Sequence, residues 1–428
     1  MYRVAMISMH GCPLARLGEK DAGGMNVYVR ELSRALGAAG LQVDVFTRCQ
    51  DYSTTQIVEL GPGARVVHIE AGAVQYIDKR QLFPILPEFT ERVDAFRRET
   101  GVHYDLIHSH YWLSGWSGMA LRREWGVPLV HMFHTLGALK NTVARSASER
   151  EPALRTSTER EIVHTTDLLI AANRLEKQDL QRYYSAAARR IAIVPCGVDI
   201  ELFHPLAQGE ARMLLNLPAV GNILLFVGRL EPIKGVDVLL DALCHIARDG
   251  CNALALIAGG DLDSPEGQRL RSIAEELGLQ ERVRFLGPVE QRNLPYFYAA
   301  ANVCVVPSFY ESFGMVAIEA MACSRPVIAS RAGGLQFTVH HGKTGLLVPP
   351  GDSLALAEAL ARLLADEKLQ ARMGRAALTE AQRYSWARVA ETVAAVYASR
   401  LFRVGARARA PATAVKGGEE QCLPTTPN

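Results

Sequence analysis

The chain has 428 residues, 49% of them hydrophobic, and a formal net charge of +2 at pH 7. This length accommodates two globular domains, and the balanced charge excludes the basic surface of a nucleic-acid-binding protein. The eight cysteines form no CxxC pair, which is typical of reduced structural thiols. No apolar run reaches the roughly 18 residues of a membrane span, and the N-terminal run is too short for a signal peptide. We therefore expect a cytoplasmic protein that acts on small molecules, without a nucleic-acid partner or a membrane span.

Short apolar runs recur along the chain, and each is followed by a longer amphipathic segment. In the first half they predict strands over residues 3–8, 41–48, 64–71, 105–110, 128–135, 167–173 and 190–197. In the second half they predict strands over residues 222–229, 252–260, 283–289, 302–308, 326–334 and 344–351. This alternation is typical of α/β domains with a parallel sheet covered on both faces. Such sheets bind ligands at the carboxyl ends of their strands, so two facing domains would form a cleft.

The stretch PCGVDIELFHP separates the two sets of strands and predicts a hinge around residues 195–210. We expect an N-terminal Rossmann-like domain over 1–197 and a C-terminal one over 198–375. Helices over 354–364 and 376–402 would close the fold, and the second would return to the N-terminal domain. The tail over 403–428 is rich in small, polar, Pro and Gly residues and is expected to be disordered.

Motifs for nicotinamide and metal binding are weak in this sequence. No GxGxxG occurs, which removes the fingerprint of a nicotinamide dehydrogenase. Asp261 and Asp263 form a DxD that could hold a metal, but a loop or helix cap is the favoured interpretation. Several histidines stand at expected strand ends without metal-ligand spacing: His10, His108, His110, His131 and His134. We expect no metal site and no required cofactor.

Charged residues in the second half predict an anion-binding and sugar-binding site. Arg229 follows an expected central strand and Lys234 comes five residues later, an arrangement that suits a diphosphate. Glu311 precedes a small-residue turn that opens a helix, and Glu319 lies two turns into that helix. Carboxylates are natural acceptors for paired sugar hydroxyls. The same two glutamates could instead be the acid and base of a glycoside hydrolase.

These residues, with GGL at 333–335 and GLLVPPGD at 345–352, resemble the family-four retaining glycosyltransferases of the GT-B fold. The resemblance covers about residues 1–400. It implies two facing Rossmann-like domains and a UDP-sugar as co-substrate. In this family the Arg and Lys hold the donor diphosphate, the first Glu and the amides after it hold the sugar, and the second Glu holds the ribose. The matching residues are Arg229, Lys234, Glu311, Gly314, Met315 and Glu319.

The opening stretch HGCPLARLGEKDAGGMNVYV is similar to the start of the D-inositol 3-phosphate glycosyltransferases, which begin mycothiol synthesis by moving N-acetylglucosamine from UDP. The resemblance implies an acceptor phosphate held by Lys79, Tyr111, Thr135 and Arg155. His10 and the loop from Asp21 through Gly23 to Asn26 would hold the inositol ring. Gly23 and Gly24 would let the backbone approach the donor diphosphate and the acceptor, where a side chain would block both.

The resemblance also implies same-face transfer, in which the leaving diphosphate accepts the acceptor's proton. Arg229, Lys234 and the Gly24 amide would stabilise the departing UDP, and His134 would lie near the reacting sugar. A buried core histidine is an equal interpretation of His134. Sucrose-phosphate synthase, another family-four transferase and an inactive nucleotide-sugar binder stay open as alternatives. The sequence fixes neither the donor sugar nor the oligomeric state, and a homodimer stays open.

Overall fold

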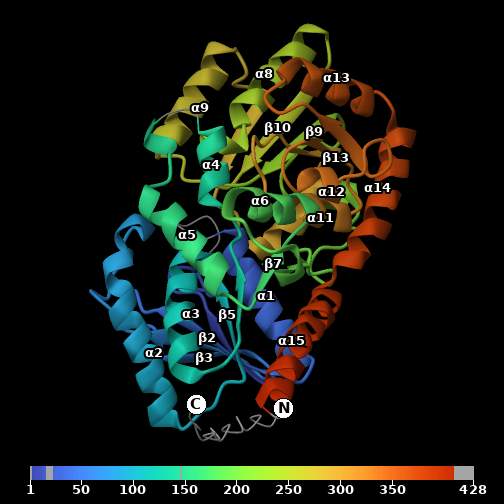
Figure 1. Cartoon of the computed structure of the whole chain (residues 1–428). Helices are drawn as coiled ribbons and strands as arrows, with labels where there is room; N and C mark the ends of the chain where they lie inside the picture. The colour runs from blue at the N-terminus through green and yellow to red at the C-terminus, as the bar shows by residue number, and fades with distance from the viewer. Residues whose placement is uncertain (1, 16–22, 145–146, 409–428) are drawn as a thin grey trace, which may run out of the picture.

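The computed structural model describes residues 2–15, 23–144 and 147–408, with side chains as far as Ser399. Its strands form two sheets, which Figure 1 shows one above the other: the first in blue to green, the second in yellow to orange. The eight-stranded sheet has the order β3-β4-β2-β1-β5-β6-β7-β8, and the six-stranded sheet has the order β11-β10-β9-β12-β13-β14. The predicted division into two sets of strands is therefore confirmed.

The first sheet is parallel except at one edge, where β3 runs antiparallel to β4. Its strands are β1 (Arg3–Ile7), β2 (Gln42–Arg48), β3 (Ile57–Gly61), β4 (Ala64–Ile69), β5 (Leu106–His110), β6 (Leu129–Met132), β7 (Leu168–Ala171) and β8 (Ile191–Ile193). Val4 of β1 aligns with Val43 of β2 on one side and Leu106 of β5 on the other. All three side chains are buried, because helices cover both faces of the sheet.

The second sheet is parallel throughout. Its strands are β9 (Asn222–Val227), β10 (Ala253–Ala258), β11 (Val283–Gly287), β12 (Val303–Val306), β13 (Val327–Ser330) and β14 (Gly345–Val348). All thirteen strands expected from the apolar runs are present. The antiparallel edge strand β3 was missed, because its half-exposed residues lack the continuous apolar run of a central strand.

Fifteen α-helices occur in the part of the chain that the structure describes. In the first half they are α1 (Gly24–Ala38), α2 (Leu86–Thr100), α3 (Tyr111–Trp125), α4 (Gly137–Val143), α5 (Ala153–Thr165) and α6 (Arg174–Tyr184). In the second they are α7 (Gln208–Leu214), α8 (Val236–Arg248), α9 (Pro265–Glu276), α10 (Leu294–Ala300), α11 (Met315–Ala322), α12 (Leu335–Thr338), α13 (Ser353–Leu364), α14 (Glu367–Ala381) and α15 (Trp386–Ala408).

The single helix predicted over 376–402 is wrong in its boundaries, because the structure has two helices there. The 3₁₀ turn Gln382–Tyr384 and the extended Ser385 separate α14 from α15. Helix α14 packs against α11 of the second half, whereas α15 packs against α1 of the first half. One straight helix could not cover both surfaces, and Figure 1 shows the red helices running from the upper half down to the lower half. Helix α15 also continues through 403–408, where a disordered tail was expected; residues 409–428 lie outside the described part.

The two crossing points between the halves lie side by side. Val198 and Ser385 form a parallel bridge, and the Val198 amide donates to the Tyr384 carbonyl at 2.8 Å. Trp386 packs so closely on Gly197 that a Cβ there would lie 2.4 Å from its ring. Further along α15, the Tyr397 hydroxyl lies 2.7 Å from His108 Nδ1 in β5. The return helix is therefore tied to the first sheet by aromatic packing and a buried hydrogen bond.

Candidate functional site

The loops that follow the carboxyl ends of the strands meet between the two sheets, and we call this region the junction. The Asn173 side chain, just after β7, donates to the Ser312 carbonyl at 2.6 Å. The Ser312 hydroxyl, after β12, donates to the carbonyl of His134, which follows β6. Parallel sheets place ligands at this edge, so the junction is where a shared ligand site is expected.

The glycines at the start of α1 lie against the second half of the chain. A Cβ added at Gly23 would be 3.8 Å from Arg229 Nε, and one added at Gly24 would be 3.4 Å from Met315 Sδ. Asn26 holds this turn, since its Oδ1 accepts from the Gly23 amide at 3.0 Å. Gly23, predicted for the acceptor, and Gly24, predicted for the donor, therefore lie across the junction from the predicted donor residues Arg229 and Met315. Asp21, also predicted, lies outside the described residues.

The cations of the second half are each paired with a carboxylate. Lys234 Nζ lies 2.5 Å from Glu311 Oε2, and both side chains are about four-fifths buried. Arg229 Nη1 lies 2.8 Å from Glu231 Oε1, and both of these side chains are exposed. Lys234 and Glu311 thus form an ion pair whose opposite charges offset each other, and the roles predicted for them at the diphosphate and the sugar stay predictions. A bound diphosphate would compete with Glu311 for the Lys234 ammonium.

Helix α11 begins directly after the turn that carries Glu311. Gly314 caps it with a φ of 87°, a left-handed conformation that glycine adopts without steric cost. A Cβ at Gly314 would lie 2.5 Å from Leu335 Cδ2, so both conformation and space require glycine. The amides at this helix start are the donors that an anion or a hydroxyl could use.

Glu319 lies on α11, one helical turn after Met315, and its side chain is directed into the second half. Its side chain is buried, and its Oε2 accepts a hydrogen bond from the Tyr298 hydroxyl at 2.8 Å. Burial raises the pKa of Glu319 to about 7. The predicted contact of Glu319 with a ribose stays a prediction.

Three of the four residues expected to hold the acceptor phosphate converge in the first half. Arg155, on α5, is 1% exposed. Its Nη1 donates to the Tyr111 hydroxyl at 3.0 Å, and its Nη2 donates to the Thr135 hydroxyl at 3.0 Å and the Thr135 carbonyl at 2.8 Å. The guanidinium carbon also lies 4.8 Å from the centre of the Tyr111 ring. We call this arrangement the Arg155 pocket.

Lys79 and His10 border the Arg155 pocket. Lys79 lies on a 3₁₀ turn, Lys79–Gln81, and is close enough to Tyr111 to lower the pKa of its hydroxyl. That effect is smaller than burial and weaker than the influence of Arg155, and the Tyr111 pKa stays above its ordinary value. The His10 ring packs 4.5 Å from the Tyr111 ring, centre to centre. Lys79, the fourth predicted phosphate ligand, therefore lies within electrostatic reach of Tyr111, which Arg155 contacts directly.

The carboxylates that surround Arg155 were not predicted from the sequence. Glu159 is fully buried; it accepts from Arg155 Nε at 2.8 Å and from the Gly137 amide at 3.0 Å, and it also accepts from the Tyr184 hydroxyl. Glu151 Oε1 lies 3.0 Å from Arg155 Nη1 and pairs with the Lys140 ammonium. Glu159 follows Arg155 by four residues on α5, so helical spacing was a usable signal for it, whereas Glu151 precedes the helix and had no such signal.

The histidines of β5 and β6 are buried and neutral. His108 bonds to Tyr397, and His131 Nδ1 lies 2.8 Å from the Ser109 hydroxyl. His110 Nδ1 lies 2.9 Å from His134 Nε2, so one of these two rings donates to the other. Burial, followed by the nearby His10, lowers the pKa of His134 to about 3. Among the described residues, no three His, Cys, Asp or Glu side chains form a group that could hold a metal.

The DxD residues form the turn before α9, as the favoured interpretation predicted. Asp261 Oδ1 accepts from the Asp263 amide at 2.9 Å, and the Ser264 hydroxyl donates to the Asp261 carbonyl at 2.6 Å. Ser264 then caps the helix by accepting from the Gly267 amide at 3.1 Å. The Asp261 carboxylate is therefore used to shape a helix start.

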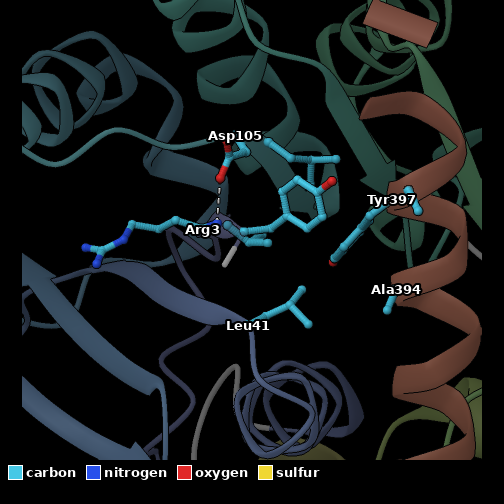
Figure 2. A pocket seen from close by; sticks show the side chains of 9 residues that line it. Arg3, Leu41, Asp105, Ala394 and Tyr397 are labelled. Atoms are coloured by element: carbon cyan, nitrogen blue, oxygen red, sulfur yellow. Dashed lines mark hydrogen bonds between the residues drawn. The ribbon is translucent and has the colours of Figure 1, made fainter. Parts of the chain in front are cut away.

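A small apolar cavity of about 160 Å³ lies far from the junction, at the amino ends of β1 and β5. Figure 2 shows it between Leu41 and the α15 residues Ala394 and Tyr397, beside the hydrogen bond from the Arg3 amide to Asp105. Its lining is almost entirely apolar, so it offers nothing to a phosphate or a sugar.

Comparison with known proteins agrees with this geometry. Residues 22–202 match the family "Glycosyltransferase Family 4", and residues 210–379 match "Glycosyl transferases group 1". A D-inositol 3-phosphate glycosyltransferase of Corynebacterium jeikeium is 44% identical over 92% of this chain and 96% of its own length. Its counterpart from Xylanimonas cellulosilytica is 41% identical over 95% of this chain and 98% of its own length.

Among the solved structures of similar fold, one is about as similar in sequence to this chain as the relatives above. The sucrose-phosphate synthase of Thermosynechococcus elongatus is 40% identical, with a TM-score of 0.87 over 94% of this chain and all of that chain. The Anabaena protein HepE, in complex with UDP and glucose, is 21% identical, with a TM-score of 0.75 over 93% of this chain and all of its own. The second likeness shows the fold alone.

The two α/β domains and the likeness to these solved structures define a glycosyltransferase of the GT-B fold. The chain belongs to family four of the glycosyltransferases, the family that includes the D-inositol 3-phosphate glycosyltransferases. In the part of the chain that the structure describes, no helix combines the length and apolar character needed to cross a membrane.

Proposed function

We propose that this enzyme moves N-acetylglucosamine or glucose from UDP to a phosphorylated polyol, with 1D-myo-inositol 3-phosphate as the preferred acceptor. The observation that carries the proposal is the Arg155 pocket, where a buried guanidinium, the Tyr111 and Thr135 hydroxyls and the nearby Lys79 converge. Two cations and two hydroxyls suit a phosphate dianion. The names of the relatives at 41–44% identity support the choice of acceptor.

On the donor side, Arg229 and Lys234 would hold the diphosphate, and Glu311 with the amides of Gly314 and Met315 would hold the sugar hydroxyls. The contact of Gly23 with Arg229 and of Gly24 with Met315 supports a donor that lies at the junction. Glu319 would reach the ribose. No divalent metal is required in this scheme, because the two cations neutralise the leaving group.

The transfer would proceed with retention of anomeric configuration. The acceptor oxygen bonds to the anomeric carbon on the face from which UDP departs, and the acceptor proton passes to the leaving phosphate oxygen. Fixed cations and amides stabilise the charge that develops on UDP. His134, at the junction, would hold a sugar hydroxyl by a hydrogen bond in its neutral form, because burial and the nearby His10 lower its pKa to about 3.

A sucrose-phosphate synthase is the second candidate, because a solved enzyme of that name is 40% identical over nearly the whole chain. Its acceptor, fructose 6-phosphate, would use the same phosphate ligands. The two candidates differ in the ring that the acceptor presents to His10 and Asn26.

An acceptor panel tests the proposal. UDP-N-acetylglucosamine and UDP-glucose should each be offered with inositol 3-phosphate, inositol and fructose 6-phosphate, and the anomer of the product should be read by NMR. We expect inositol 3-phosphate to give the highest kcat/KM. Preference for fructose 6-phosphate would move the assignment to the second candidate, and equal use of unphosphorylated inositol would contradict both.

The phosphate ligand Lys79 offers a matched pair of variants. Lys79→Ala should raise the acceptor KM by roughly 10- to 150-fold and leave the donor KM unchanged, because one charge-assisted contact is lost. Arg80→Ala removes an exposed cation from the same 3₁₀ turn and should leave both constants near the wild-type values.

A further inference from the structure

Arg48 is a buried arginine at the end of β2, and its side chain binds main-chain carbonyls. The residue is 1% exposed. Nη2 donates to the Gln75 carbonyl at 2.7 Å, and Nη1 donates to the Ala73 carbonyl at 2.9 Å. Nη1 also lies 3.2 Å from the Cys49 carbonyl and 3.5 Å from the Ala71 carbonyl. A buried charge is costly unless hydrogen bonds replace its water, so these carbonyls and the guanidinium hold each other in place.

The loop over residues 71–75, which we call the 71–75 loop, has few other contacts that could fix it. It follows β4 and contains neither helix nor strand. None of residues 72–79 is buried. The Gly72 amide donates to Glu88 Oε2 at 3.0 Å, which ties one end of the loop to α2. Because side-chain packing contributes little here, the hydrogen bonds of Arg48 are the main link between the loop and the sheet.

The 71–75 loop leads directly to Lys79, the predicted phosphate ligand. Lys79 begins the 3₁₀ turn Lys79–Gln81, and three residues separate it from Gln75, whose carbonyl accepts the shortest of the Arg48 hydrogen bonds. Over so short a stretch, a shift of the Gln75 carbonyl carries Lys79 with it. The position of Lys79 relative to Tyr111 therefore depends on Arg48.

The main chain of Arg48 is hydrogen-bonded to the segment that carries His10. The Arg48 amide donates to the Met9 carbonyl at 2.9 Å, and the next residue, His10, packs its ring 4.5 Å from the Tyr111 ring. Strand β2 itself lies inside the sheet, between β1 and β4. Arg48 thus connects an inner strand to both segments, one through its amide and the other through its guanidinium. Residues on rigid elements hold a binding site more precisely than loops do on their own.

We propose that Arg48 is a positioning residue of the acceptor site, which fixes the 71–75 loop and thereby holds Lys79 in place for the acceptor phosphate. This inference rests on the proposed function, which assigns that phosphate contact to Lys79. An arginine suits the task because its planar fork donates to several carbonyls at once, whereas a lysine has a single ammonium group. Arg48 touches no substrate in this scheme, so it affects acceptor binding and takes no part in bond making.

Steady-state kinetics of Arg48→Lys test the inference, with inositol 3-phosphate and the UDP-sugar that the acceptor panel selects. The variant keeps the charge and removes the fork. It should raise the acceptor KM roughly 5- to 50-fold, because a misplaced ligand binds weakly, and leave kcat and the donor KM within about twofold of the wild type. In a Lys79→Ala background the same substitution should raise the acceptor KM by less than about twofold, because the loop no longer carries the ligand.

Arg65→Gln is the matched control. It breaks the ion pair between Arg65 Nε and Asp44 Oδ1, 2.7 Å apart, which joins the same two strands, β2 and β4, near their amino ends. It should lower the stability of the fold and leave the acceptor KM unchanged. The comparison separates the specific effect of Arg48 on the acceptor from a general weakening of the sheet.

Trypsin cleavage of the wild type gives a second measurement, which decides if Arg48→Lys does not fold. Lys79 and Arg80 are trypsin sites next to the 71–75 loop. If Arg48 fixes the loop in the free enzyme, cleavage at these sites without acceptor should be at least about 100-fold slower than in a synthetic peptide of residues 71–85. Cleavage as rapid as in the peptide would overturn the inference.

The outcomes separate this inference from the proposed function. An unchanged acceptor KM in Arg48→Lys, while Lys79→Ala raises it, would overturn the inference and leave the proposed acceptor site intact. Additive effects of the two substitutions would show that Arg48 acts independently of Lys79 and would overturn it as well, as would an equal rise of the donor KM. If Lys79→Ala does not raise the acceptor KM, the proposed phosphate site fails and the inference fails with it.

Discussion

Two residues at the junction have backbone conformations that side chains rarely adopt. Tyr111 has a φ of 71° and His134 a φ of 62°, and each follows a strand of the first sheet. Such conformations cost on the order of 1–3 kcal/mol and persist where the surrounding structure holds them. Here they aim the Tyr111 hydroxyl at Arg155 and place the His134 carbonyl against Ser312. The strain therefore lies where the proposed substrates would meet.

The neutral state of His134 predicts the pH dependence of catalysis. Because burial lowers its pKa to about 3, His134 should not titrate between pH 5 and 9. We expect kcat at saturating substrates to show no limb near pH 6.5. Profiles of the wild type and of His134→Gln check this. A limb near pH 6.5 that disappears in His134→Gln would mean that the ring takes up a proton during turnover.

Buried Glu319 makes stability depend on pH. Burial raises its pKa from 4.5 to about 7, so between these values the folded chain binds more protons than the unfolded chain. Stability should therefore fall as the pH rises through this window, by about 2–3 kcal/mol for this group. In Glu319→Gln this contribution to the pH dependence of the free energy of unfolding should vanish. Urea unfolding of the wild type and the variant at pH 5 and pH 8 measures it.

A residual slope is expected in that variant. Glu176 is also buried, and its pKa is likewise raised to about 7. Glu176→Gln should remove a further part of the pH dependence of the free energy of unfolding in the same way. If Glu319→Gln has the full wild-type slope, its carboxyl group does not titrate in this window.

At the scale of elements, two helices begin at glycines for different reasons. At the start of α1, Gly23 has a φ of −169°, which any residue adopts, and a Cβ at Gly24 would only touch Met315. At the start of α11, Gly314 has a left-handed φ and no room for a Cβ. The fold alone therefore requires glycine at α11. At α1, a requirement for glycine would have to come from a ligand.

This difference predicts opposite effects of two alanine substitutions. Gly314→Ala should lower stability by about 1–3 kcal/mol, because the left-handed conformation and the contact with Leu335 are both strained. Gly24→Ala should change stability by less than about 1 kcal/mol but lower kcat/KM for the UDP-sugar at least tenfold. Thermal unfolding and donor kinetics measure the two effects. Normal kinetics in a folded Gly24→Ala would mean that the donor does not approach this backbone.

At the scale of the whole molecule, α15 begins directly after Ser385, where the chain returns from the second half to the first beside Val198. Its Trp386 packs on Gly197 and on the Tyr28 ring of α1, and its Tyr397 bonds to His108 inside the first sheet. In the described part of the chain, His108 Nε2 has no partner, so the bond to Tyr397 is the hydrogen bond of that ring. An enzyme whose substrates bind between two domains needs those domains in a fixed relative position. The contacts of α15 with the first half help to hold them there.

Tyr397→Phe tests whether the hydrogen bond between Tyr397 and His108 stabilises the fold. Loss of the hydroxyl leaves a buried imidazole nitrogen unsatisfied, which should lower stability by about 1–3 kcal/mol. The Tyr397 side chain lies far from the junction, beside the apolar cavity of Figure 2, so both KM values should stay unchanged. Thermal unfolding and steady-state kinetics give the two readouts. Tyr2→Phe, which removes an exposed hydroxyl near the same cavity, is the control and should not change stability.

The sequence alone determined the two sets of parallel strands, because thirteen apolar runs bounded by turns can be buried in few other ways. It also supplied the family, through short motifs at strand ends, and with the family the roles expected of Arg229, Lys234 and Glu311. What it could not supply were features set by long-range packing. The break between α14 and α15 depends on two surfaces that are distant in sequence. Burial lowers the pKa of His134 and raises the pKa of Glu319, and it depends, like the full set of partners around Arg155, on elements brought together only by the fold. Hydrophobic periodicity contains no information about either.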